Sequence, residues 1–95
     1  MAHFMREELL RMIATARKIH GANLQGVDLH EQDLSNANLS NASLQRANMG
    51  WVNLVWSDLH SANLRAAHLW RSNLPGADLT GADLGTAVWL TWPTQ

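Results

Sequence analysis

Leucine recurs at every fifth position along most of this chain, from Leu24 to Leu84, and Met49 is the one conservative interruption. The series comprises Leu24, Leu29, Leu34, Leu39, Leu44, Leu54, Leu59, Leu64, Leu69, Leu74, Leu79 and Leu84. A small apolar residue stands two positions before most of these leucines. Asn, Asp or another mostly polar residue lies between the two series. The hydrophobic pattern therefore has a period of five.

A period of five matches neither a helix nor a continuous strand. On an α-helix, five residues advance by about 500°, so the leucines would form no face. On a strand, odd spacing would send alternate leucines to opposite sides. Within one pentad, however, the small residue, the polar residue and Leu alternate as a three-residue strand pointing in, out and in. The pattern predicts a short straight segment in each pentad.

The remaining two residues of each pentad must turn the chain. Gly21, Gly26, Gly76 and Gly81 all fall in the slot before the small residue, where tolerance of positive φ is useful. Each pentad then forms one side of a polygon. Successive polygons are expected to stack as a solenoid with a strand-like spacing of about 4.8 Å.

Segments 37–41 and 77–81 read Ala-Asn-Leu-Ser-Asn and Ala-Asp-Leu-Thr-Gly. With this motif, the chain resembles the pentapeptide-repeat family over residues 21–91. The resemblance implies an all-β solenoid, a right-handed quadrilateral β-helix with about three and a half coils of four pentads each. Each position then stacks on the one twenty later, and the resulting inner ladder places Leu24, Leu44, Leu64 and Leu84 in the core.

Gln32, Ser57 and Ser72 interrupt the small-residue series and would point inward. Buried polar groups need hydrogen-bond partners. We expect the backbone or an N-terminal cap to supply them. Leu and Ala side chains fill the remaining interior, so no ligand cavity is expected there.

Residues 1–20 precede the repeat and carry apolar residues at helical spacing. These are Met5, Leu9, Met12, Ile13 and Ala16. We expect an amphipathic helix that covers the open first coil, because a bare solenoid end exposes leucines and an unpaired edge. A helix lying on a membrane surface is the alternative. It is disfavoured because two acids offset the four basic residues and the segment lacks Trp.

At the other end, residues 92–95 form a short tail. Trp89, Leu90 and Trp92 make an apolar edge that would gain from burial. The tail could fold over its own last coil, or the coil could stack on a second subunit. Because members of the resembled family pair through such ends, we expect a homodimer.

The composition limits the number of domains and the kinds of binding partner. With 95 residues and 46% hydrophobic content, the chain suits one small domain. A net charge of −1 provides no strong field toward nucleic acid or an anionic membrane. There are no cysteines, and no apolar run reaches the roughly 20 residues of a membrane span. We expect a cytoplasmic protein without direct nucleic-acid or membrane contacts.

No catalytic, metal or cofactor site emerges from the sequence. None of His30, His60 and His68 has another histidine as its ladder neighbour, and metal binding needs converging ligands. Ser57 and Asp58 point to opposite sides, which excludes a catalytic pair. The outward carboxylates are interpreted as solvated repeat positions. They are Asp28, Asp33, Asp58, Asp78 and Asp83. We therefore predict no enzymatic activity and no cofactor.

Tryptophan in outward turn positions favours a protein-interaction or scaffolding module. Gly50 leaves room for Trp70 to lie against the wall near Trp51, and Arg71 stacks beside Trp51 for a cation–π contact. Exposed Trp with Arg is typical of an interface anchor. The alternative is that the rings only pack locally. The partner-binding candidates are Trp51, Trp56, Trp70, Arg71 and His30.

The resemblance also implies an alternative function, because some longer family members imitate duplex DNA and modulate type II topoisomerases such as gyrase. Residues 21–91 hold six acidic residues against three arginines, a net charge of −3. Duplex DNA of the same length would carry about ten charges, at one per ~1.7 Å. The low charge density therefore disfavours a DNA mimic.

Overall fold

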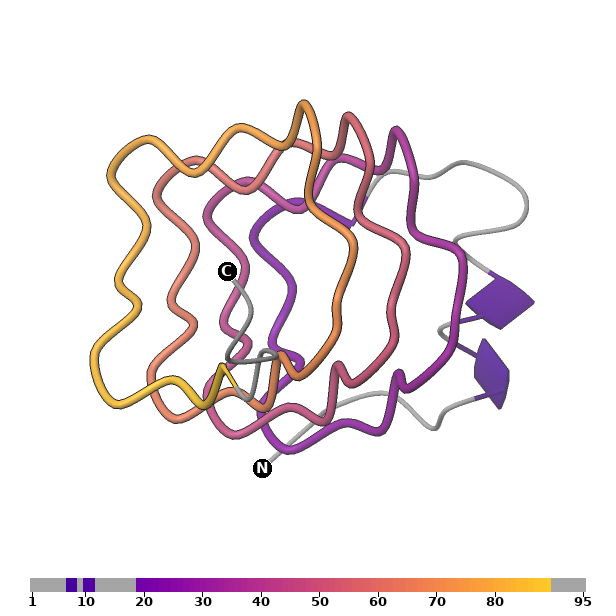
Figure 1. The fold of residues 1–95 in the computed structure, drawn as a ribbon, viewed down its shortest axis with the longest axis horizontal. Coiled ribbons are helices and arrows are strands. Elements are labelled where there is room, and N and C mark those ends of the chain that lie inside the picture. The colour runs from indigo at the N-terminus through magenta and orange to yellow at the C-terminus, as the bar shows by residue number, and fades with distance from the viewer. Residues whose placement is uncertain (1–6, 9, 12–18, 90–95) are drawn as a thin grey trace.

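The computed structural model describes residues 7, 8, 10, 11 and 19–89. Residues 7, 8, 10 and 11 are helical, and residues 19–89 wind as stacked coils (Figure 1). The described coils contain isolated parallel β-bridges in place of extended strands. Each of ten bridges joins the middle residue of one pentad to the residue twenty positions later, from Asn23↔Ser43 to His68↔Val88. The architecture is a β-helix solenoid, as the period of five predicts.

Backbone hydrogen bonds between neighbouring coils hold the solenoid together. The Ser43 N–H donates to the Ala22 carbonyl at 2.9 Å, and the Leu24 N–H donates to the Ser43 carbonyl at 2.7 Å. The middle residue of a pentad therefore bonds to the preceding coil, and its two neighbours bond to the following one. This alternation is that of a parallel β-ladder.

Each pentad ends in a tight turn. In the turn at residues 24–27, the Val27 N–H donates to the Leu24 carbonyl at 3.2 Å, and Gly26 has a φ of 70°. Positive φ at the third residue of a four-residue turn is the mark of type II geometry. All fourteen residues in this slot, from Gly21 to Thr86, have φ between 56° and 75°. The turn slot predicted from the glycines is confirmed.

The leucine ladders form the core. Leu24, Leu44 and Leu64 are completely buried, and the other leucines of the first coils are equally inaccessible. Leu84, also predicted to be a core residue, is only partly buried. It lies in the last described coil, and no later described coil covers it. The prediction for Leu84 was therefore too strong.

The preference for Asn or Asp in the middle of a pentad has a cause beyond solvation. The side-chain Oδ1 of ten such residues accepts a hydrogen bond from the backbone N–H two residues later, at 3.0–3.3 Å. The acceptors are Asn23, Asp28, Asp33, Asn38, Asn48, Asn53, Asp58, Asn63, Asp78 and Asp83. This N–H belongs to the first turn residue, so the side chain satisfies a donor at the corner. Asn73 makes no such bond because Pro75 has no N–H.

The inward polar residues differ from one another. The Ser72 hydroxyl donates to the Leu69 carbonyl at 2.9 Å, as expected. Ser57 is 1% exposed, and its hydroxyl has no hydrogen-bond partner among the described residues. The expectation of a partner was wrong for this hydroxyl: unlike that of Ser72, it makes no hydrogen bond to the backbone carbonyl three residues earlier. Gln32 is half-buried.

At the N-terminal end, the described helical residues lie beside the first coil (Figure 1). Leu10 packs against the core, and Ile19 is 2% exposed. The periodicity did not single out Leu10. The predicted apolar face of the helix falls on Met5, Leu9, Met12, Ile13 and Ala16, which lie outside the described residues.

The side-chain caps can be tested with two equivalent asparagines. We expect Asn63→Ala to destabilise the protein by about 0.5–1.5 kcal/mol, because the Arg65 N–H loses its intramolecular acceptor. Asn73→Ala removes the same side chain from a pentad in which Pro75 provides no donor, so it should change stability much less. Urea denaturation followed by circular dichroism measures both. Equal losses in the two variants would contradict the capping role.

Candidate functional site

Trp51 and Arg71 pack on one another at a single corner of the solenoid. We call this corner, made of turn residues 30, 31, 50, 51, 70 and 71, the Trp51 corner. The Arg71 Cζ lies 4.8 Å from the centre of the Trp51 ring, which confirms the predicted cation–π contact. Trp51 remains 54% exposed. The corner therefore presents a large aromatic surface beside a guanidinium group.

Trp70 lies against the same corner over Gly50, as the sequence predicts. A Cβ atom on Gly50 would be 3.9 Å from Trp70 Cε3, which is ordinary contact distance. The Trp70 ring also stacks with His68 at a centroid distance of 6.2 Å. Trp70 is 42% exposed. One face of the ring is supported by the wall, and a large part of it remains accessible.

Trp56 belongs to the next corner along the chain and is the most exposed of the three, at 69%. A Cβ atom on Gly76 would lie 2.6 Å from atoms of the Trp56 ring, so the ring rests on a surface that only glycine provides. The sequence reasoning found the Gly50 contact but missed this one. Both glycines stand twenty positions from their tryptophan, which is the signal that could have revealed the pair.

His30, the remaining partner-binding candidate, lies at the Trp51 corner and contacts two acids. Its Nδ1 is 2.6 Å from Asp28 Oδ1, and its Nε2 is 3.7 Å from Glu31 Oε1. The structure thus brings His30, Trp51, Trp70 and Arg71 to one corner, with Trp56 on the adjacent one.

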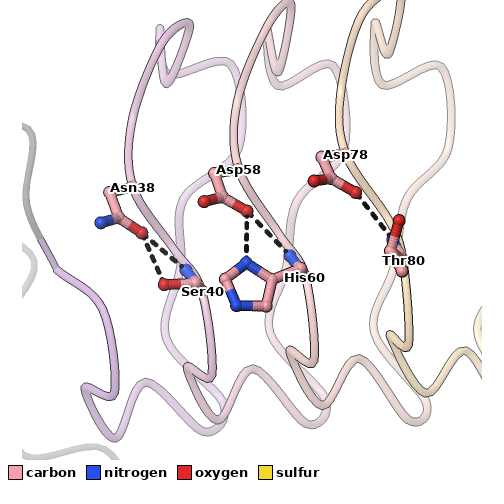
Figure 2. Close-up of polar contacts among 6 residues, drawn as sticks. All are labelled: Asn38, Ser40, Asp58, His60, Asp78 and Thr80. Carbon is pink, nitrogen blue, oxygen red and sulfur yellow. Dashed lines mark hydrogen bonds and ion pairs between the residues drawn. The ribbon is translucent and has the colours of Figure 1, made fainter.

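Asp58, His60 and Asp78 form a second polar group on another part of the wall (Figure 2). Their ligand-type atoms all lie within 4.8 Å of one another. His60 Nδ1 is 2.8 Å from Asp58 Oδ1, and the same oxygen accepts the His60 backbone N–H at 3.1 Å. The Thr80 N–H donates to Asp78 Oδ1 at 3.0 Å.

The two carboxyl groups of this cluster have lowered pKa values. For Asp58, hydrogen bonding to the His60 side chain is the main cause, followed by the His60 backbone N–H, and both lower its pKa. The negative charge of Asp78 acts in the opposite direction. For Asp78, hydrogen bonding to the Thr80 side chain and then to its backbone lowers the pKa. Both groups therefore carry a negative charge at neutral pH.

Sequence reasoning missed this cluster because it compared each histidine only with residues in its own ladder. His60 stands two positions after Asp58, and Asp78 stands twenty positions after Asp58. Combining the two spacings would have identified the three residues as neighbours.

At the C-terminal end, Val88 and Trp89 are each 36% exposed. Leu90 and Trp92, the other self-association candidates, lie outside the described residues. Leu74, Leu79 and Leu84 of the last described coil are only partly buried. Part of the hydrophobic core is therefore accessible at this end of the described solenoid.

Comparison with known proteins agrees with this geometry. The sequence profile of pentapeptide repeats matches residues 22–60 and 57–87, with eight copies. The chain belongs to the pentapeptide-repeat family. Pentapeptide-repeat proteins are generally non-enzymatic repeat scaffolds, and no catalytic family is indicated for this one.

Several solved pentapeptide-repeat structures are similar. HetL, a protein involved in heterocyst differentiation regulation in the cyanobacterium Nostoc sp. strain PCC 7120, is 35% identical over 92% of this chain, with a TM-score of 0.69. This chain spans 35% of HetL, about a third of its length. No curated protein matches the chain.

Two further pentapeptide-repeat structures are each 27% identical to this chain. One, from Nostoc PCC 7120, has a TM-score of 0.36 and aligns over 96% of this chain and 88% of its own. The other, from the Arabidopsis thaliana thylakoid lumen, has a TM-score of 0.39 and aligns over 78% and 59%. Among the described residues of the present pentapeptide-repeat protein, no helix has the length and apolar content needed to cross a membrane.

The support of Trp56 by Gly76 can be separated from the role of glycine in the turn. Gly26→Ala meets nothing within 4 Å and introduces only the strain of a side chain at a φ of 70°. We expect it to cost about 1 kcal/mol. Gly76→Ala adds a clash with the Trp56 ring, so it should cost more and shift the NMR resonance of the Trp56 indole N–H. Equal stability losses and an unmoved resonance would show that the ring does not rest on Gly76.

Proposed function

We propose that this chain is a non-enzymatic protein-interaction or scaffolding module whose binding surface carries Trp51, Trp56 and Trp70. The main observation in support is that these three tryptophan side chains, on two adjacent corners, remain 42–69% exposed. Exposed aromatic clusters of this kind mark interaction sites, and Trp and Arg are enriched among the residues that dominate binding energy.

The backbone conformation at two of the tryptophans supports a role other than folding. Trp51 and Trp56 have φ values of 61° and 60°, in the left-handed region. Bulky residues are uncommon there, and glycine occupies the same slot at Gly26 and Gly81 without that cost. The turn itself therefore does not require an aromatic side chain at either position.

The rings are also held in place before any partner binds. Trp70 lies on Gly50, Trp56 lies on Gly76, and Arg71 covers part of Trp51. A side chain that is already ordered loses less conformational entropy on binding. We call the surface that carries Trp51, Trp56 and Trp70 the tryptophan wall. Its side chains are suited to contact a protein partner.

Two finer features of the architecture belong to this proposal. The helical segment covers the first coil of a right-handed quadrilateral β-helix of about three and a half coils. The contact of Leu10 with the core supports this arrangement. The partly exposed leucines and Trp89 at the other end support self-association through the C-terminal coil.

The alternative of a DNA-mimicking topoisomerase modulator is less well supported. The outward acids are few and partly compensated, as in the contact of 3.5 Å between the Arg65 guanidinium and Asp83. A DNA mimic needs a dense, uncompensated row of negative charge.

The binding role of the tryptophan wall is tested by replacing two of its tryptophans. We expect Trp51→Ser with Trp70→Ser to preserve the circular dichroism spectrum and to abolish capture of a specific protein from a lysate of the source organism. Direct titration with that purified protein should show at least about a hundredfold loss of affinity, since hot-spot tryptophans contribute 2 kcal/mol or more.

The matched control is Arg46→Ser with Arg65→Ser, which removes large side chains from the same two turn slots of another corner. This control should bind normally. If the tryptophan variant captures the same proteins with the same affinity, the wall is not the binding surface. If it unfolds, the tryptophans are structural.

Self-association is tested separately at the open end. We expect the wild type to be a dimer at high micromolar concentration by light scattering, and Trp89→Ser to be a folded monomer, because the change removes apolar area from the edge. The tryptophan-wall variant should remain dimeric. A monomeric wild type at this concentration would refute end-to-end pairing.

A further inference from the structure

Asp58, His60 and Asp78 bring two carboxylates and one imidazole together across two neighbouring coils (Figure 2). No other group of three or more His, Asp or Glu side chains comes this close among the residues that the structure describes. We propose that these three side chains bind a divalent first-row transition-metal ion, for which Zn²⁺ is the test ion. This site is independent of the tryptophan wall and of the partner proposed for it.

The donor atoms determine the class of ion. Imidazole nitrogen suits Zn²⁺, Ni²⁺ and Cu²⁺, whereas sites built from oxygen alone suit Mg²⁺ and Ca²⁺. Three protein ligands with an open position for water are a common zinc arrangement. The mixed set of one nitrogen and two carboxylates therefore favours a transition-metal ion over the alkaline earths.

The distances are close to those that coordination requires. Ligand atoms around a tetrahedral zinc ion, at bonds of about 2.0–2.2 Å, lie about 3.3–3.6 Å apart. His60 Nδ1 and Asp58 Oδ1 are 2.8 Å apart in a hydrogen bond, and every pair in the cluster lies within 4.8 Å. Binding of an ion replaces this hydrogen bond: Nδ1 gives up its proton, and the two atoms move apart by about 0.5–0.8 Å. Asp78 is exposed, so its carboxylate can rotate through the remaining distance.

Hydrogen bonds orient both carboxylates toward this position. Asp58 Oδ1 accepts the His60 N–H, and Asp78 Oδ1 accepts the Thr80 N–H. Each carboxylate has a second oxygen besides the Oδ1 that accepts this backbone N–H. The backbone hydrogen bonds therefore hold both carboxylates near the imidazole.

The stacking of two acids is a further geometric feature of the cluster. Asp58 and Asp78 face one another across a β-bridge, and aspartate side chains are ordinarily ionised at neutral pH. Like charges directly opposite in a sheet are destabilising. The other aspartates of the bridged ladders are paired with neutral residues, for example Asp28 with Asn48 and Asp33 with Asn53. A bound cation would relieve the one place where two acids meet.

The chain contains a comparison site at Asp28 and His30, where the further carboxylate is Glu31 of the same coil, 3.7 Å from His30 Nε2. Asp28 and His30 repeat the spacing of Asp58 and His60, with Nδ1 and Oδ1 2.6 Å apart. The bridge partner of Asp28 is Asn48, which contributes no negative charge. If an aspartate two residues before a histidine were enough for binding, the two sites would bind equally.

The experiment is a calorimetric titration of the metal-free chain of 95 residues with Zn²⁺. We expect one equivalent to bind to the wild type, and Asp78→Asn and His60→Ser each to weaken binding at least about tenfold. Both changes preserve the turn, because Asn38 and Ser40 occupy the equivalent positions in the preceding coil. Asp28→Asn with His30→Ser should leave binding unchanged.

Thermal denaturation provides the second measurement. Zn²⁺ should raise the melting temperature of the wild type and of the Asp28/His30 variant, and at the same concentration should raise that of Asp78→Asn less. Mg²⁺ should have a much smaller effect. The proposal is overturned if the wild type shows no saturable Zn²⁺ binding, or if Asp78→Asn and His60→Ser bind as tightly as the wild type.

Discussion

A left-handed backbone conformation at every fifth residue is the constraint on which this solenoid depends. It turns the chain at each corner, and it directs the N–H of the turn residue toward the following coil, as in the 2.9 Å bond from Trp51 to Trp70. The ladder bonds repay the steric cost that non-glycine residues incur in this conformation. Because the turn recurs at a fixed interval, residues twenty apart are aligned, and leucine stacks on leucine.

Much of the fold follows from the sequence because a strict period leaves few alternatives. The inward and outward positions, the turn slot and the burial of Leu24, Leu44 and Leu64 all follow from a single spacing. The contacts of Trp70 with Gly50 and of Arg71 with Trp51 could also be predicted, because each joins residues on neighbouring coils of one corner. Position along the chain specifies such contacts almost completely.

The features that could not be predicted from the sequence depend on side-chain orientation and on the position of a residue near an end of the solenoid. The caps made by Asn63 and its equivalents require Oδ1 to turn back toward the chain, and a solvated side chain would show the same composition. Leu84 is more exposed than Leu44 because burial depends on coils on both sides. The isolation of the Ser57 hydroxyl reflects the rotamer that it adopts, which periodicity does not determine.

The inward and middle positions of each pentad are committed to the core and the caps, so the turn positions are the ones that can vary without loss of the fold. The Trp51 corner uses this freedom at its aromatic and arginine residues, and the Asp58–His60–Asp78 cluster uses it at His60, which stands beside two capping aspartates. Each coil contacts only its neighbours, so a change at one corner has mainly local effects. Function in this solenoid is therefore expected to depend on the turn side chains that the repeat motif leaves unspecified, together with the twenty-residue spacing that places neighbouring coils side by side.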